Sequence, residues 1–287
     1  MSYYLFANIL GNHVFDESVN LVASGDTARY NCLLPSLEMQ KKFLAHFKNP
    51  VFFPVFHEKN MLLTRQALKD AVGPDSFIIQ ATSAIEELDK HANGLVKRLR
   101  EWYELYNPEL SREIPDNLAF VQQVCLSPPK PKDSAGADLT DKDLSPIVDL
   151  AKSCQELFTL RQSYEAYLES ILKNSAPNLL SITGALIGAK LICRAGSLKH
   201  LSEIPASTVQ LLGAEKALFR HMRTGARPPK YGILYQHQLI QRAGKQMQGK
   251  AARLLADKIS IAAKVDYFKG EFVGDKLFKD IEKKMKK

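Results

Sequence analysis

The residues best suited to bind a ligand gather in one stretch, residues 211–237, which reads LLGAEKALFRHMRTGARPPKYGILYQH. Its formal cations outnumber its single acid, Glu215, and they are Lys216, Arg220, Arg223, Arg227 and Lys230. If GAEKALFRHMR is helical, the first three cations are spaced by four and three residues and share one face. Leu218 and Met222 lie on another flank, so the pattern predicts a basic stripe facing outward and an apolar edge facing inward.

The predicted helix must end near Gly225, because that glycine and Pro228-Pro229 cannot continue it. The last two cations of the stretch then lie on a constrained loop. Cations on a rigid helix and loop suit phosphate contacts, since little conformational freedom remains to be lost on binding. The rings of Tyr231, Tyr235 and His237 follow and could stack on unpaired bases. A solvated basic face with buried tyrosines is the alternative, and charge alone favours nucleic-acid binding over it.

A second basic set follows in residues 241–258, and it comprises Arg242, Lys245, Lys250, Arg253 and Lys258. Arg253 lies one helical turn before Asp257, so pairing with that acid could make it structural. From Pro177 onward the chain holds 21 Lys and Arg against 8 Asp and Glu, a net of +13. The first 176 residues hold 18 against 23, a net of −5, and the two parts sum to +8. This asymmetry indicates a polyanionic partner for the C-terminal part.

Enzyme signatures are missing from the sequence, which has no GxxxxGK[ST], GxGxxG, HExxH or GxSxG motif. The seven histidines are scattered, and the four cysteines, Cys32, Cys125, Cys154 and Cys193, form no CxxC pair. We therefore expect reduced thiols, no catalytic residue, no metal site and no cofactor. The most apolar run, ITGALIGAKLIC, is short and is interrupted by Lys190, so no membrane span is expected.

Three regions are expected to position these residues, in a chain that is mostly α-helical. Residues 1–72 read as a small α/β domain whose first strands form a hairpin at the Gly11-Asn12 turn. Residues 73–176 contain two helices with heptad spacing, separated by the connector SPPKPKDSAGAD, which interrupts any continuous helix. The two heptad helices and their connector predict either an antiparallel coiled-coil hairpin or a pair of helices in a globular bundle. Residues 177–287 read as an all-helical domain.

The seam of the hairpin is predicted from apolar residues that recur at alternating spacings of three and four. It comprises Ile85, Leu88, Ala92, Leu95, Leu99, Trp102, Ile147, Leu150, Cys154, Leu157, Arg161, Tyr164, Leu168 and Ile171. Arg161 is the exception among them. Its guanidinium could extend to the edge of the seam or pair with an acid across it.

Three long segments resemble the Nop domain family. They are APNLLSITGALIGAKLI, AGSLKHLSEIPASTVQLLGAEKALFRHMRTGARPPKYGILYQH and KAARLLADKISIAAKVDYFKGEFVGDKL, and the likeness extends over about residues 139–278. The resemblance implies a non-catalytic scaffold of the box C/D small ribonucleoprotein, which directs ribose 2′-O-methylation of RNA. It implies an N-terminal domain that docks the methyltransferase fibrillarin and a coiled coil that forms a homodimer. The C-terminal Nop domain would bind guide RNA together with a ribosomal-type kink-turn-binding protein. S-adenosylmethionine would belong to the methyltransferase.

The resemblance and the charge pattern together give a set of candidate RNA-binding residues: Lys216, Arg220, Arg223, Arg227, Lys230, Gln236, His237, Arg242, Lys245 and Arg253. The family motif implies that Gln236 and His237 meet the kink-turn stem. It also implies a partner-facing motif at Gly213, Ala214 and Glu215, with Glu215 either at the helix start or on the partner protein.

Two other functions stay open at this point. A spliceosomal-type scaffold would bind a kink-turn particle without a methyltransferase. A DNA-repair factor is suggested by short helix–turn pieces such as SLKHLSEIPAS, but no Gly-apolar-Gly hairpin accompanies them. The short lysine tail favours an archaeal, cytoplasmic protein, whereas a eukaryotic source would imply the nucleolus.

Overall fold

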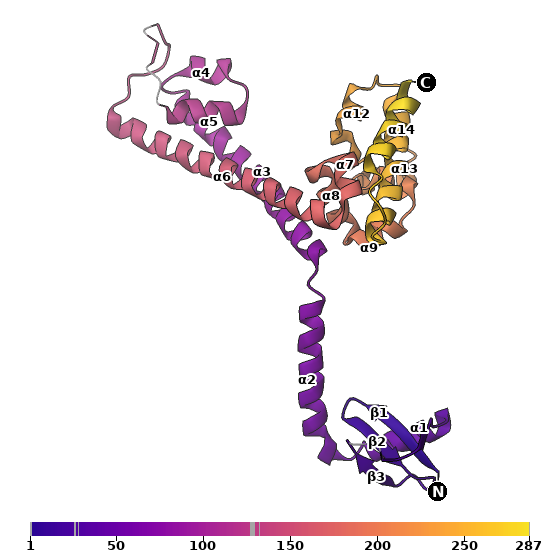
Figure 1. The fold of residues 1–287 in the computed structure, drawn as a ribbon. Coiled ribbons are helices and arrows are strands. Elements are labelled where there is room, and N and C mark those ends of the chain that lie inside the picture. Colours follow the sequence, from indigo (N-terminus) through magenta and orange to yellow (C-terminus); the bar gives the residue numbers. More distant parts are fainter. Residues whose placement is uncertain (1, 26, 28, 127–129, 132, 287) are drawn as a thin grey trace. The chain divides into compact units, whose positions relative to one another are not determined.

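The structure is a computed structural model that describes residues 2–25, 27, 29–126, 130–131 and 133–286. The chain divides into two compact units, Met1–Gly73 and Pro74–Lys287 (Figure 1). The predicted boundary at residues 72–73 lies beside this division. The predicted boundary at residues 176–177 falls inside the second unit, between two consecutive helices.

The first unit is a small sheet with helices. Its elements are β1 (Tyr3–Asn8), β2 (Gly11–Phe15), β3 (Leu21–Ser24), β4 (Cys32–Leu33), α1 (Leu37–His46), the 3-10 helix η1 (Pro50–Phe52) and α2 (Phe53–Asp70). The strand order is β3-β2-β1-β4, antiparallel except for the β1–β4 pair. The predicted hairpin is confirmed, but its turn is wrong. Asn8 pairs with Gly11, so the turn residues are Ile9 and Leu10, and the Asn8 side chain accepts a hydrogen bond from the Leu10 amide.

The second unit begins with the hairpin, which is antiparallel as predicted (Figure 1). Its long helices are α3 (Pro74–Tyr103) and α6 (Asp141–Ser175), joined through α4 (Pro108–Glu113) and α5 (Asn117–Cys125). Residues 78–85 share a buried cluster with residues 168–172, whereas residues 96–103 share another with residues 147–154. The sequence missed α5, whose Phe120 and Val124 join the second cluster and make that end of the hairpin a small bundle.

The predicted seam is correct for most residues but wrong for Leu95 and Trp102. The buried seam residues are Ile85, Ala92, Leu99, Ile147, Cys154 and Leu168, while Leu88, Leu150, Leu157, Arg161, Tyr164 and Ile171 are half-buried. Leu95 and Trp102 are 37% and 39% exposed, and Val96 and Tyr103 take the buried positions instead. Since Ala92 and Leu99 keep their predicted places, the spacings of three and four occur in the opposite order on this part of α3. The buried residues of α5 belong to the same cluster.

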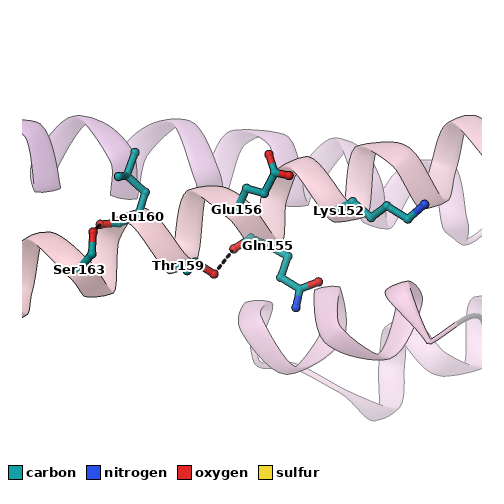
Figure 2. A pocket seen from close by; sticks show the side chains of 6 residues that line it. All are labelled: Lys152, Gln155, Glu156, Thr159, Leu160 and Ser163. Carbon is teal, nitrogen blue, oxygen red and sulfur yellow. Dashed lines mark hydrogen bonds between the residues drawn. The ribbon is translucent and has the colours of Figure 1, made fainter.

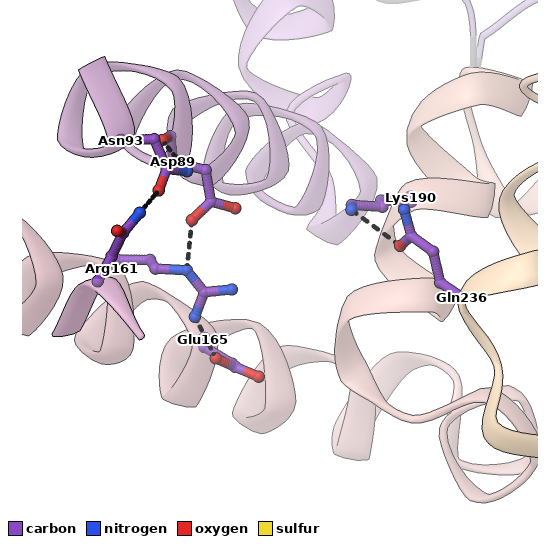
Figure 3. A network of polar contacts seen from close by, with 7 residues as sticks. Asp89, Asn93, Arg161, Glu165, Lys190 and Gln236 are labelled. Atoms are coloured by element: carbon purple, nitrogen blue, oxygen red, sulfur yellow. Dashed lines mark hydrogen bonds and ion pairs between the residues drawn. The ribbon is translucent and has the colours of Figure 1, made fainter. Parts of the chain in front are cut away.

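Arg161 pairs with acids instead of extending into solvent. Its Nε lies 2.6 Å from a carboxylate oxygen of Asp89 on α3, and its guanidinium also donates to Glu165 at 2.8 Å (Figure 3). Part of the connector, residues 127–129 and 132, lies outside the described residues. Its described part is tied to α4, since the Ser134 hydroxyl and the Ala135 amide both donate to Glu109.

Short helices surround a central one in the rest of the second unit. They are α7 (Pro177–Thr183), α8 (Ala185–Ala195), α9 (Leu198–Glu203), α10 (Ala206–Leu211), α11 (Glu215–Thr224), the 3-10 helix η2 (Ile233–Gln236), α12 (Gln238–Arg242), α13 (Gln248–Tyr267) and α14 (Gly274–Lys286). The central helix is α13, whose Leu255, Ile259 and Ala262 are fully buried in the core. Asp266 near its end accepts hydrogen bonds from the first amides of α7, at Asn178 and Leu179.

Among the described residues, no single helix has the length and apolarity of a membrane span. Helices α7 and α8 together reach that apolar length, but they are bent by 118°. Most of their large apolar side chains, such as Leu179, Leu191 and Ile192, are buried in the core of this unit.

Candidate nucleic-acid interface

Residues 213–232 leave the core and return to it at nearly the same place. We call this segment the basic loop. Its two ends run side by side, since the amides of Gly232 and Ile233 donate to the carbonyls of Gln210 and Leu212 at 3.0 and 2.8 Å. The Gln210 side chain also donates to the carbonyl of Lys230 at 2.6 Å. These hydrogen bonds hold the two ends of the basic loop together, so the residues between the ends form one connected segment.

Glycine is needed at both ends of the basic loop. Gly213 has φ +84°, and a Cβ there would lie 2.7 Å from a side-chain carbon of Ile233. A Cβ on Gly232 would lie 1.9 Å from the carbonyl oxygen of Leu212, closer than any van der Waals contact. The glycines of GAEK and YGIL thus have a steric cause, which is the close crossing of two backbone segments.

Helix α11 begins and ends as the sequence predicts, but it packs differently. Glu215 folds back to accept the Gly213 amide at 2.6 Å, which is the helix-start role of the two that were expected. Gly225 ends the helix in the left-handed conformation, and the His221 ring donates from Nδ1 to the carbonyl of Ala226. The predicted inward apolar edge is wrong, because α11 has no buried residue and Met222 is 66% exposed.

The five cations of the basic loop are all exposed. None of them forms an ion pair with another residue in the described part of the chain. Lys258, from the second basic set, provides the contrast: it is buried and its ammonium lies 2.8 Å from Asp280 and 3.6 Å from Asp257. Lys258 is therefore structural, whereas the loop presents uncompensated positive charge that suits a polyanion.

The remaining candidates divide into exposed and buried residues. Gln236, Arg242, Lys245 and Arg253 are exposed. The anticipated pairing of Arg253 with Asp257 is absent among the described residues, since Asp257 faces Lys258 instead. Sequence reasoning missed Lys190 on α8, which donates to the side-chain oxygen of Gln236 at 3.1 Å (Figure 3). Its proximity depends on the packing of α8 beside η2, for which the sequence carries no signal.

The prediction that His237 contacts RNA is wrong for this structure. Its side chain is buried, its Nδ1 accepts the Leu239 amide at 3.2 Å, and its Nε2 faces the carbonyl of Ile182 at 3.0 Å. Because an amide can only donate and a carbonyl can only accept, the ring is neutral with its proton on Nε2. Burial lowers the pKa of His237, although the bond to Ile182 partly opposes this shift.

No metal-ligand cluster of three or more His, Cys, Asp or Glu side chains occurs within the described ranges. One surface hollow lies on α6, lined by Lys152, Gln155, Glu156, Thr159, Leu160 and Ser163 (Figure 2). All of these lining residues come from a single helix face, so the hollow marks an uncovered side of the hairpin.

The structure defines the class of this molecule as an all-helical unit with an exposed basic loop, preceded in the chain by a small α/β unit. The profile of the Nop family, described as "snoRNA binding domain, fibrillarin", matches residues 84–130 and 128–287. The chain therefore belongs to the Nop family.

The relatives include archaeal and eukaryotic proteins. A NOP5 family protein of Methanocaldococcus jannaschii is 38% identical over 269 residues, which cover 85% of this chain and 65% of that protein. Nucleolar protein 58 of Schizosaccharomyces pombe is 39% identical over 215 residues, which cover 67% of this chain and 42% of that protein. The chain thus spans 65% or less of the length of these relatives. A crystal structure of a fibrillarin/Nop5p complex contains a chain of the same fold, with TM-score 0.50, 24% identity and 98% of each chain covered.

Proposed function

We propose that this protein is a non-catalytic scaffold of a box C/D small ribonucleoprotein. Its second unit would bind kink-turn guide RNA together with a kink-turn-binding protein, and its first unit would dock fibrillarin. The scaffold itself would need no cofactor, since the methyltransferase would carry S-adenosylmethionine. The single observation that carries the proposal is the basic loop, whose exposed cations have no acidic partner among the described residues.

The comparisons support the same proposal. The matching family is described as a snoRNA binding domain, and the related structure is a complex with fibrillarin. An archaeal cell would place the protein in the cytoplasm and a eukaryotic cell in the nucleolus, as for the nucleolar relatives.

A gel-shift titration at several salt concentrations tests the RNA part, using box C/D RNA with and without a bound kink-turn-binding protein. Tight binding only in the presence of that protein supports composite recognition. Equal binding in both cases would indicate a general basic surface and contradict the proposal. Capture of fibrillarin by the purified chain tests the methyltransferase part. RNA binding without capture would favour the spliceosomal-type scaffold instead.

We also propose that the hairpin forms a homodimer. Apolar side chains remain exposed on both long helices, among them Trp102 on α3 and Leu160 and Tyr167 on α6, each 39–46% exposed. Leu160 borders the uncovered hollow of α6 (Figure 2). Light scattering of the purified chain tests the proposal, with Leu160→Glu and Tyr167→Glu expected to shift a dimer toward monomer. Masses that correspond to a monomer at all concentrations would contradict it.

A further inference from the structure

Two tyrosines form a stacked pair beside the basic loop. The rings of Tyr231 and Tyr235 lie 4.8 Å apart between centroids and are nearly parallel, with an interplanar angle of 11°. Tyr231 is half-buried, and its hydroxyl donates to the side-chain oxygen of Gln248 at 2.9 Å. Tyr235 is 45% exposed. Tyr231 therefore stacks on one face of the Tyr235 ring, while much of Tyr235 stays accessible to solvent.

The backbone that carries Tyr235 is held in place on both sides. Leu234, which precedes it, is fully buried in the core. His237, two residues later, is fixed through both ring nitrogens. The amide of Tyr235 itself donates to the carbonyl of Gly232 at 3.1 Å. The ring is thus presented by a rigid segment, so little conformational entropy would be lost when a ligand covers it.

Polar residues adjoin Tyr231 and Tyr235 in the chain. Lys190 donates to the side-chain oxygen of Gln236, the neighbour of Tyr235 (Figure 3). An ammonium can only donate, so the oxygen of Gln236 must face Lys190. Its amide NH₂ donates to no acceptor in the part of the chain that the structure describes. Lys230 is exposed and lies next to Tyr231 in the chain. A surface that offers an aromatic ring together with cations and hydrogen-bond donors is of the kind that binds unpaired bases.

We propose that Tyr235 stacks on one unpaired base of the bound RNA through the ring face away from Tyr231, with Gln236 available to donate to the edge of that base. The proposal rests on the proposed function, because it assumes an RNA ligand on this surface. It assigns the base-stacking role to Tyr235 among the three rings that the sequence left open. His237 is buried, and Tyr231 is half-buried with its hydroxyl bound to Gln248, whereas Tyr235 is 45% exposed.

The experiment measures RNA affinity by gel shift for the full chain, with kink-turn box C/D RNA and a kink-turn-binding protein already bound. Tyr235→Ala is expected to weaken binding about 5- to 150-fold, the range for loss of one base–aromatic stack. Tyr235→Phe and Tyr235→Trp are expected to stay within about 2-fold, because each keeps a π face. Phe268→Ala, which removes an exposed ring at the end of α13, is the matched control and should not change affinity.

A second arm identifies the base by replacing each unpaired base in turn with an abasic residue. One abasic RNA should reproduce the loss with the wild-type protein and cause no further loss with Tyr235→Ala. Wild-type affinity for Tyr235→Ala would overturn the inference. An equal loss for Tyr235→Phe, or a loss that is independent of every abasic position, would overturn it too.

The failures of the two proposals are distinguishable. If the wild-type chain does not bind the RNA at any salt concentration, the proposed function fails and the inference with it. If binding and its salt dependence persist while Tyr235→Ala has no effect, only the base-stacking role fails. A thermal unfolding curve of Tyr235→Ala that matches wild type ensures that the affinity change reports binding.

Discussion

Neutralising three cations of α11 should flatten the salt dependence of RNA binding without loss of stability. Lys216, Arg220 and Arg223 are exposed and have no ion pair among the described residues, so each is free to contact a phosphate. Each phosphate contact contributes about 0.7–0.9 to the slope of log affinity against log salt, so the triple Gln variant should lose about 2–3 from that slope. Between 50 and 200 mM salt, these contacts account for roughly a 20- to 40-fold change in affinity.

The stability of the triple variant should match that of wild type, because α11 has no buried residue and surface substitutions cost about 0.5 kcal/mol or less each. The matched control is a triple Gln variant on α14, at Lys276, Lys279 and Lys283, which removes the same net charge from other exposed positions. Fluorescence anisotropy titrations with kink-turn RNA at four salt concentrations measure both slopes. An unchanged slope in the α11 variant, or an equal loss in the α14 variant, would refute the assignment of phosphate contacts to α11.

Three other substitutions or conditions test the architecture. At pH 6.5, the ordinary pKa of histidine, His237 should stay neutral in the folded protein, and imidazole ¹⁵N shifts measure this. Below pH 6.5 the free energy of unfolding should fall, because the unfolded chain then binds a proton on this ring that the folded chain does not bind. Denaturation curves at several pH values measure that fall. Asp266→Ala should cost about 2–4 kcal/mol in urea denaturation, since it leaves three buried donors at the start of α7 without an acceptor. Gly232→Ala should cost about 2 kcal/mol or more, because its Cβ would overlap the carbonyl of Leu212.

Each of these predictions has a control in the same chain. Gly244→Ala should be nearly neutral, because a Cβ there meets nothing within 4 Å. Asp275→Ala should cost less than about 1 kcal/mol, since Asp275 is exposed and, among the described residues, accepts only the Ser181 hydroxyl at 3.2 Å. The prediction for His237 would be contradicted by a half-protonated imidazole at pH 6.5 or by a stability that rises on acidification. Either result would show that the ring is more exposed than in the structure.

Much of the fold could be predicted from the sequence because it depends on local patterns. Heptad spacing predicted the two long helices, and the order of their buried clusters confirmed the antiparallel hairpin. The burial pattern at the far end could not be predicted, since it includes residues of α5 and leaves Leu95 and Trp102 outside the seam. The turn of the first hairpin was missed because strand pairing places Asn8 opposite Gly11.

The sequence by itself determined where the charge is, where α11 must start and stop, and which family the chain resembles. These properties depend on residue identity and on backbone preferences that act within a few positions. Only the tertiary structure decided which of those residues reach solvent. It buried His237 against the Ile182 carbonyl, paired Lys258 with Asp280, and brought Lys190 to Gln236 from 46 residues away. Solvent exposure and ion pairing depend on contacts between segments distant in the chain, and a single sequence does not encode those distances in any local pattern.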